Sequence, residues 1–282
     1  MPRIYLLFIL YAMSSSNINR LRSYHSTDFD VNDLTLNSDE VKQIVSCTLE
    51  DVCDHNFSEK WNNFYNQHTK GNFFKMRNYI PIVFHSYLQL VNDNFGTLLE
   101  VGCGYGCSLF PIMKSFPNIS VIATDFSSIS IDILRANENY DVEKIIFSFV
   151  WDVSTPLCPA VPLVDSILCV FSLSAIQPSL HQKALSNMVN ILLQGGYILF
   201  RDYGVNDMTM FRHKSRHGDN FYRRSDGTLA YYFSLEYLRE LVSSLPLDVM
   251  ELNYATVINR NRKKGIAMYR VFVHAVFQKR TE

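Results

Sequence analysis

The chain has 282 residues, of which 48% are hydrophobic and 19% charged, and its formal net charge is −1. This composition excludes a largely disordered chain, and the length suffices for one large α/β domain or two small ones. A nearly neutral chain carries no global signature of nucleic-acid binding, so any basic surface must be local. The six cysteines are scattered without the spacing of a zinc site, which predicts reduced thiols and no bound metal.

Residues 1–57 predict a variable, partly disordered leader in front of a domain that spans 58–282. The apolar run Ile4–Met13 is too short to cross a bilayer, so no membrane span is expected. Residues 1–27 contain Arg3, Arg20 and Arg22 but no acidic residue, as mitochondrial transit peptides do. Two locations therefore stay open: the cytoplasm or nucleus, and the mitochondrion. Residues 38–49 show the apolar spacing of an amphipathic helix.

Residues 60–90 are dense in aromatic side chains and predict helices that pack in front of a sheet. Beyond them, apolar runs alternate with helical patterns, which is typical of a parallel sheet with helices on both faces. Residues 204–233 form a long connection, and connections of this length are usually functional or disordered. The expected strands are Thr97–Gly102, Ser120–Phe126, Ile145–Asp152, Val164–Leu173, Gly196–Asp202, Asp248–Ile258 and Met268–Gln278, and the expected helices are Gly106–Phe116, Ser128–Tyr140, Ser179–Leu193 and Ser234–Leu245.

The first expected strand ends in Glu100, and glycines follow it at positions 102, 104 and 106. Glycines there let the backbone approach a ligand without a Cβ in the way. Asp125 ends the next strand about 20 residues on, the spacing at which nucleotide-binding α/β units place a carboxylate on the ribose hydroxyls. The glycine spacing differs from the dinucleotide fingerprint, and no Gly-Lys-Ser/Thr completes a P-loop. The turn and the acid together predict a nucleoside-containing cofactor.

The pattern Glu-x-Gly-x-Gly-x-Gly after a strand resembles motif I of the S-adenosylmethionine (SAM) methyltransferases. Over residues 58–280 the chain is similar to the tRNA N3-methylcytidine methyltransferases. The motifs that carry this resemblance are Trp61-x-x-Phe64-Tyr65, Phe73-Phe74-Lys75-x-Arg77, Leu99-Glu100-Val101-Gly102-Cys103-Gly104-x-Gly106, Asp125-Phe126-Ser127, Phe171-x-Leu173-Ser174-Ala175-Ile176, Leu199-Phe200-Arg201-Asp202-Tyr203-Gly204, Asn220-Phe221-Tyr222-x-Arg224-x-Asp226-Gly227-Thr228 and Met268-Tyr269-Arg270-Val271. The chain departs from the family pattern at Met76, Cys107 and Gln177.

The resemblance implies a Rossmann-like class I sheet of seven mostly parallel strands, the last of them antiparallel. It implies that SAM is the methyl donor and that N3 of a cytidine in the anticodon loop of tRNA is the acceptor. Some relatives depend on an aminoacyl-tRNA synthetase, and whether this chain does so stays open. Two alternatives are a methyltransferase for a small molecule or protein, and an inactive partner subunit, because a fold does not fix a substrate.

Each part of SAM needs a partner in such a site. Asp125 is expected to bind the ribose, and Asp152, at the end of the following strand, either accepts from the adenine amine or serves as a turn residue. The backbone of Gly102 and Gly104 is expected to meet the methionine part, with the helix start near Gly106 favouring its carboxylate. Glu100 is expected to hold the loop or to meet the ammonium through water.

Three more cofactor residues rest on the resemblance. It places Trp61, Tyr65 and Val170 in the cofactor pocket. Helical spacing alone would make Trp61 and Tyr65 core aromatics.

Methyl transfer to N3 of cytosine needs no strong base, because N3 already has an in-plane lone pair. The product is a cationic base, and a nearby carboxylate can stabilise that charge and later accept a proton. Asp202 is the expected catalytic carboxylate, with Arg201 holding it or contacting phosphate and Tyr203 stacking on the base. The alternative is a purely structural Arg–Asp pair.

Base pairing occupies N3 of cytosine in a duplex, so the acceptor must be unpaired or turned out of its stack. Local basic segments interleaved with aromatics favour RNA binding, although a charge cluster is usually only a solvated face. The expected RNA-contacting residues are Lys75, Arg77, Arg212, Lys214, Arg216, Phe221, Tyr222, Arg224, Arg260 and Arg262.

Overall fold

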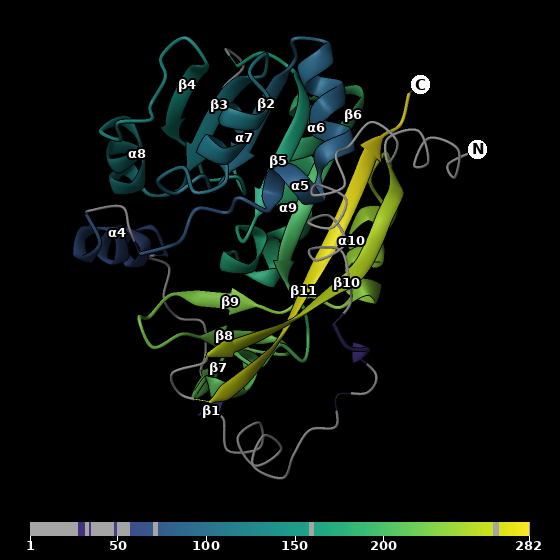
Figure 1. Cartoon of the computed structure of the whole chain (residues 1–282). Helices are drawn as coiled ribbons and strands as arrows, with labels where there is room; N and C mark the ends of the chain where they lie inside the picture. The colour runs from purple at the N-terminus through teal and green to yellow at the C-terminus, as the bar shows by residue number, and fades with distance from the viewer. Residues whose placement is uncertain are drawn as a thin grey trace.

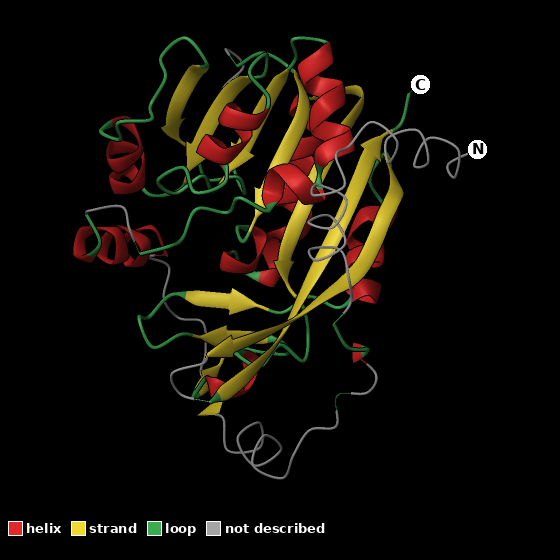
Figure 2. Cartoon of the chain, viewed as in Figure 1, coloured by secondary structure: helices red, strands yellow, loops and turns green. Residues whose placement is uncertain are grey.

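The computed structural model describes residues 28–31, 34, 48–49, 57–69, 73–157, 161–261 and 265–281. These residues form a seven-stranded sheet and a smaller four-stranded sheet, with helices on both faces of the larger one (Figures 1 and 2). No helix in the described part of the chain combines the length and the apolar character needed to cross a bilayer.

The large sheet has the strand order β10-β11-β6-β5-β2-β3-β4. Its central strands run parallel, while β11 runs antiparallel to both β6 and β10. This confirms the expected sheet of seven mostly parallel strands with an antiparallel last strand. The strands are β2 (Thr97–Val101), β3 (Ser120–Asp125), β4 (Ile145–Val150), β5 (Val164–Val170), β6 (Leu192–Tyr203), β10 (Leu247–Asn261) and β11 (Ile266–Lys279).

Helices pack against both faces of the large sheet. Successive side chains of a strand point to opposite faces and therefore enter different hydrophobic clusters. Leu98 packs into one hydrophobic cluster and its neighbour Leu99 into another. Helices α5 (Ile80–Val83), α6 (His85–Asp93), α7 (Leu109–Ser115) and α8 (Ser128–Arg135) contribute to the Leu98 cluster. Helices α9 (Pro178–Ile191) and α10 (Leu235–Ser243) contribute to the Leu99 cluster.

Several element boundaries differ from expectation; the helix expected over Ser128–Tyr140, for example, ends at Arg135. The helix expected over Ser179–Leu193 ends at Ile191, and β6 begins at Leu192, before the expected start at Gly196, so Gly195 and Gly196 both lie within the strand. The β5–β6 register shifts there, and Gly195 has a φ of 76°, so the glycine serves an irregularity within the strand. The predicted helix at 38–49 is wrong at its end, since Thr48–Leu49 forms strand β1; residues 38–47 lie outside the described residues.

The connection at 204–233 folds into the small sheet, with the order β1-β7-β8-β9. Leader strand β1 pairs in parallel with β7, which joins the leader to this connection. A bridge between Gly204 and Phe233 closes the base of the small sheet. Its other elements are β7 (Ser215–Arg216), β8 (Phe221–Arg223), β9 (Leu229–Tyr231) and the 3-10 helix η3 (Met210–Arg212).

A second leader segment contacts the large sheet at β10. The Phe29 amide donates to Thr256 Oγ1 at 3.3 Å, and that hydroxyl donates to the Phe29 carbonyl at 2.7 Å. Asp28 accepts from the Ile258 amide at 2.8 Å, and the Phe29 ring meets the Tyr269 ring edge to face. Residues 28–29 and 48–49 of the expected leader are therefore integrated into the fold.

Candidate active site

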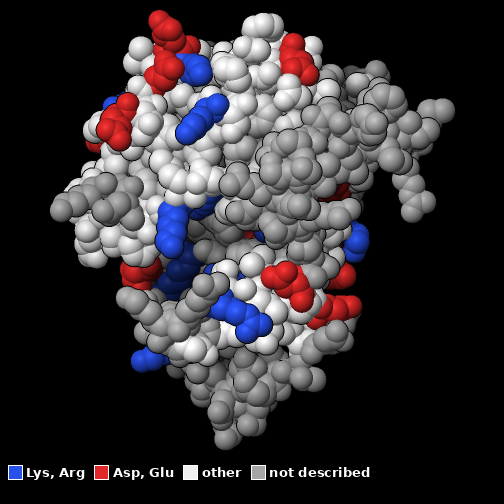
Figure 3. Space-filling view, viewed as in Figure 1, with Lys and Arg blue, Asp and Glu red and all other residues white. Residues whose placement is uncertain are grey.

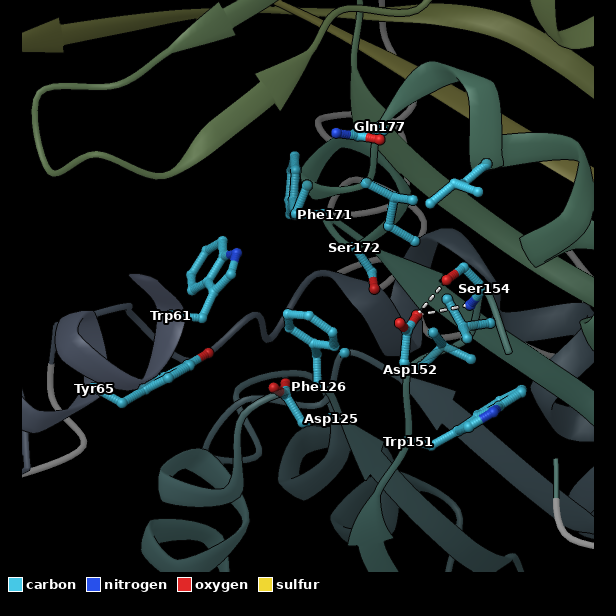
Figure 4. Close-up of a pocket in the computed structure, with 16 residues that line it drawn as sticks. Trp61, Tyr65, Asp125, Phe126, Trp151, Asp152, Ser154, Phe171, Ser172 and Gln177 are labelled. Atoms are coloured by element: carbon cyan, nitrogen blue, oxygen red, sulfur yellow. Dashed lines mark hydrogen bonds between the residues drawn. The ribbon is translucent and has the colours of Figure 1, made fainter. Parts of the chain in front are cut away.

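Two adjoining hollows open at the carboxyl ends of β2, β3 and β5, where parallel sheets bind ligands. The larger spans about 760 Å³ of empty space, including the part that is open to solvent. We call it the cofactor hollow, and the smaller one the acceptor hollow. The cofactor hollow is lined by Trp61, Tyr65, Val101, Gly102, Asp125, Phe126, Trp151, Asp152, Val153, Ser154, Phe171, Ser172, Ala175, Ile176, Gln177 and Leu180 (Figure 4), and the acceptor hollow by Trp61, Tyr65, Phe74, Arg77, Gly102, Cys103, Gly104, Tyr105, Cys107, Val170, Phe171, Tyr203 and Arg224.

The glycine turn after β2 has the close packing that the sequence predicts. Gly102, Gly104 and Gly106 all have positive φ, of 70°, 53° and 90°. A Cβ on Gly102 would overlap Ser172 Oγ, and one on Gly106 would overlap a neighbouring phenyl ring. Only glycine fits these backbone angles and this space, and its fit brings the backbone to the wall of the hollows.

Asp125 ties this turn to the end of β3 and lines the cofactor hollow. Its carboxylate accepts from the Gly104 amide and the Ser127 amide, both at 2.8 Å. Burial raises the pKa of Asp125, and the two amides oppose that shift. The position is the one expected of a ribose-binding carboxylate.

Asp152 serves as a turn residue, one of the two roles that the sequence left open. One carboxylate oxygen accepts from the Ser154 amide at 2.9 Å and the Ser154 hydroxyl at 2.7 Å, which makes a side-chain turn (Figure 4). The residue also lines the cofactor hollow.

Glu100 is fully buried beneath the glycine turn, and the charge of the half-buried Arg77 acts on it. It lines neither hollow, and within the described structure neither of its carboxylate oxygens has a hydrogen bond of ordinary geometry. Burial raises its pKa to about 8, an effect opposed by the Arg77 charge. Arg77 donates to Ser108 Oγ at 3.1 Å and lines the acceptor hollow. Arg77 was expected beside Lys75 on an RNA surface, but Lys75 is exposed and Arg77 lies inside the site.

Helix α4 (Phe57–Gln67) carries Trp61 and Tyr65, which line both hollows. The two rings pack at 5.9 Å between centroids, and a third ring of α4, Phe64, contacts both. Both residues therefore belong to an aromatic cluster and to the site at once. Val170, at the end of β5, is buried and lines the acceptor hollow, not the cofactor hollow in which the resemblance places it.

The three residues expected to act in catalysis lie at the end of β6 but do not form one group. Asp202 is fully buried, lines neither hollow, and accepts from the Ser174 amide at 3.0 Å and the Tyr203 amide at 2.9 Å. Burial raises its pKa to about 6. The expected Arg201–Asp202 contact is wrong, because neighbouring strand residues point to opposite faces.

Arg201 instead lies between the rings of Tyr79 and Phe272, with guanidinium–centroid distances of 5.4 and 5.3 Å. It is buried and lines neither hollow, so it is in no position to contact phosphate either. Tyr203 lines the acceptor hollow, as a base-stacking residue would.

The structure also corrects part of the expected RNA surface. Phe221 and Tyr222 are only 1% and 3% exposed and belong to hydrophobic clusters, so these rings do not reach a base. Arg224 extends from the small sheet into the acceptor hollow, 5.2 Å from the Tyr203 ring centroid.

Several of the other predicted cations lie on the surface. Lys75, Arg212, Lys214 and Arg260 are exposed, and Arg216 is half-buried beside Asp219. Figure 3 shows basic side chains along the hollowed band between the two sheets. Arg262 lies outside the described residues.

Sequence reasoning missed several lining residues, among them Phe126, Phe171 and Gln177. Phe126 and Phe171 directly follow strand ends, and that position was an available signal. Gln177 follows a 3-10 turn, η2 (Leu173–Ala175). No sequence pattern predicted that turn. In the described part of the chain, no group of three or more His, Cys, Asp or Glu residues is arranged to hold a metal ion.

Comparison with known proteins agrees with this geometry. A family model described as a methyltransferase domain matches residues 99–198. A solved SAM-dependent methyltransferase from Anabaena variabilis superposes with a TM-score of 0.63 at 14% identity, covering 83% of this chain and 100% of that one. That likeness shows the shared fold.

Two curated relatives are much more similar in sequence. The tRNA N(3)-methylcytidine methyltransferase trm140 of Schizosaccharomyces pombe is 35% identical over 256 residues, which are 85% of this chain and 80% of the relative. The human tRNA N(3)-cytidine methyltransferase METTL6 is 34% identical over 250 residues, 84% of this chain and 85% of the relative. At this identity and coverage, the chain belongs to the tRNA N(3)-methylcytidine methyltransferase family.

Proposed function

We propose that this protein transfers the methyl group of SAM to N3 of a cytidine in the anticodon loop of tRNA. The observation that carries the proposal is that the two hollows share Trp61, Tyr65, Gly102 and Phe171. A donor in one and an acceptor base in the other would meet at this shared wall. Bringing the two groups together in line is the main requirement of such a reaction and supplies roughly 7–11 kcal/mol.

The residues present fit SAM. Asp125 and Asp152 offer carboxylate oxygens for the ribose and the adenine amine. Glu100 is buried behind the glycine turn and lines neither hollow, and its carboxylate oxygens have no hydrogen bond of ordinary geometry in the described structure, so it would act on the donor's ammonium through the loop or a water. Gly102 lines both hollows, so the methionine part would reach past it to Arg77 and Gly104 at the edge of the acceptor hollow. When bound, SAM supplies a methyl group activated by a positively charged sulfur.

The acceptor side is built for an unpaired base. Tyr203 offers a ring on which a pyrimidine would stack, and Arg224 offers donors to a carbonyl or phosphate oxygen. Asp202 fixes the backbone of Tyr203 and therefore acts as a positioning residue. The exposed cations of the small sheet and its surroundings would hold the phosphates of a loop, whose unpaired nucleotides favour the anticodon loop as target.

The test uses the purified full chain with methyl-labelled SAM and total tRNA. After digestion, mass spectrometry identifies the modified nucleoside, and we expect N3-methylcytidine. A matched control is Asp125→Ala, which should lose SAM binding and transfer together. Labelling of protein or of small molecules alone would contradict the proposal, as would SAM binding without any transfer, which favours an inactive subunit.

Two finer parts of the proposal need their own tests. We propose the cytoplasm or nucleus as location, with a mitochondrial address in residues 1–27 as the alternative; imaging of the tagged full chain separates them. Because some relatives depend on an aminoacyl-tRNA synthetase, we also propose, on that resemblance alone, that one assists the reaction. Adding purified synthetases to the transfer assay one at a time should then raise turnover with one of them.

A further inference from the structure

Phe171 is the one residue of the shared wall that holds an unusual backbone conformation with a bulky side chain. In the described chain, the non-glycine residues with positive φ are Phe95, Phe171, Asn206 and Asn220. Asparagine tolerates this conformation, whereas phenylalanine is strained in it. Phe95 is 74% exposed and lies before β2, far along the strand from the site, but Phe171 lines both hollows. Strain of this kind gathers at functional sites.

The backbone of Phe171 is fixed by its surroundings. Its amide donates to the Arg201 carbonyl at 2.9 Å, which continues the β5–β6 pairing by one residue. The next side chain, Ser172, packs against Gly102, and the chain then turns into η2. The left-handed φ therefore lets the chain leave the sheet while the Phe171 ring stays at the junction of the hollows (Figure 4).

The ring touches two residues that line the acceptor hollow, one beside the glycine turn and one at the end of β6. The Arg77 guanidinium lies over it at 5.1 Å from the centroid, and the Tyr203 ring packs on it at 4.8 Å. Phe272 closes a third side, edge to face, at 5.6 Å. Arg77 lies against the glycine turn through Ser108, and Tyr203 lies on the acceptor wall. The ring is thus the physical link between Arg77, beside the glycine turn, and Tyr203, at the end of β6.

We propose that Phe171 is a positioning residue that holds Arg77 over the glycine turn and Tyr203 against the acceptor base, and that its strained backbone is retained for this purpose. A planar guanidinium stacks on an aromatic face, and an aliphatic side chain offers no such face. The inference rests on the proposed function, because it assigns Arg77 to the donor and Tyr203 to the acceptor.

The experiment compares Phe171→Leu and Phe171→Tyr with Phe95→Leu, which changes a phenylalanine of similar φ outside the site. SAM affinity is measured by calorimetry without tRNA, and kcat and both KM values are measured with tRNA. We expect Phe171→Leu to weaken SAM binding about tenfold and to lower kcat at least tenfold, with a Tm close to that of Phe95→Leu. Phe171→Tyr should stay within about threefold of the parent in SAM affinity and in kcat. Phe95→Leu should match the parent in both quantities.

A double-mutant cycle with Arg77→Lys identifies the route of the effect. If Phe171 acts through Arg77, the double variant binds SAM no more weakly than the poorer single variant. Additive losses, unchanged SAM affinity in Phe171→Leu, or a Phe171→Tyr variant as weak as Phe171→Leu would each overturn the proposal. Should Phe171→Leu fail to fold, Phe171→Tyr and Arg77→Lys still decide it. Calorimetry measures SAM binding without any transfer. A parent protein that binds SAM but leaves tRNA unmodified would therefore contradict the proposed function without contradicting the role of Phe171 in SAM binding.

Discussion

Glu100 is a carboxyl group buried behind the glycine turn, and the proposed function brings the donor's ammonium near it. Its pKa of about 8 means that the free protein holds a proton there at neutral pH. The unfolded chain loses that proton near the ordinary pKa of a glutamate. The Glu100 contribution to stability is therefore present at low pH and is lost as the pH rises through about 8. A bound ammonium would reverse this preference, because it favours the ionised carboxylate.

We therefore predict that SAM affinity rises with pH between about 6 and 8, by up to roughly tenfold per unit, as Glu100 gives up its proton. Calorimetry in buffers of different ionisation enthalpy would measure both the affinity and the proton released. Glu100→Gln is the matched control, since it keeps the shape and removes the titration. If the parent and this variant share one pH profile, Glu100 is not the group that meets the ammonium.

At the scale of elements, one side chain joins two walls of the site. Asp202, near the end of β6, accepts from the Ser174 amide within η2 and from the adjacent Tyr203 amide. Residues on either side of the 3-10 turn line the cofactor hollow, and Tyr203 lines the acceptor hollow. The carboxylate therefore sets the relation between the two walls without entering either hollow.

Asp202→Asn should lower kcat at least tenfold and change SAM affinity less than about threefold. The amide group places a donor against one of two backbone donors, which shifts Tyr203, while Asp125, Asp152 and Glu100 keep their places. Single-turnover kinetics and calorimetry would measure the two quantities. An unchanged turnover would remove Asp202 from the reaction altogether.

At the scale of the whole molecule, the leader and the long β10–β11 hairpin are tied together. Thr256 is fully buried and exchanges two hydrogen bonds with Phe29, more than two hundred positions earlier in the chain. Thr256→Val keeps the shape and removes both bonds. We expect a loss of about 1–2 kcal/mol in the free energy of unfolding and faster hydrogen exchange at residues 28–31. Thr281→Val, at an exposed position, is the control. If the two variants have the same free energy of unfolding and the same hydrogen exchange, the Phe29–Thr256 bonds do not hold the leader on the hairpin.

The charged surface makes a further prediction at this scale. Affinity for tRNA should fall steeply with salt, because each phosphate contact contributes about 0.7–0.9 to the log–log slope. Replacing Lys75 and Lys214 with glutamine should flatten the slope by roughly 1.5 while leaving SAM affinity unchanged. Titrations of labelled tRNA at several salt concentrations would measure it. A slope that stays the same would place the RNA elsewhere on the molecule.

The sequence by itself determined the sheet and the donor side of the site. Apolar runs alternate with helical patterns, glycines follow Glu100, and Asp125 ends the next strand. Each of these is a local pattern that favours one low-energy local structure. These features therefore predicted a parallel sheet with helices on both faces, the position of the turn and the carboxylate opposite it, while the antiparallel last strand came from the family resemblance. The family motifs added Trp61 and Tyr65, whose helical spacing alone indicates only packing.

Only the tertiary structure decided the acceptor side. Arg77 and Arg224 are more than a hundred residues apart in the chain and resemble ordinary surface cations, yet both line the acceptor hollow. Phe221 and Tyr222 resemble stacking residues, yet the small sheet buries both. Burial, the direction of a side chain on its strand and the strain at Phe171 depend on segments distant in the chain. A local sequence pattern does not specify which distant residues will become neighbours. Burial, side-chain direction and backbone strain are therefore fixed only when the chain folds.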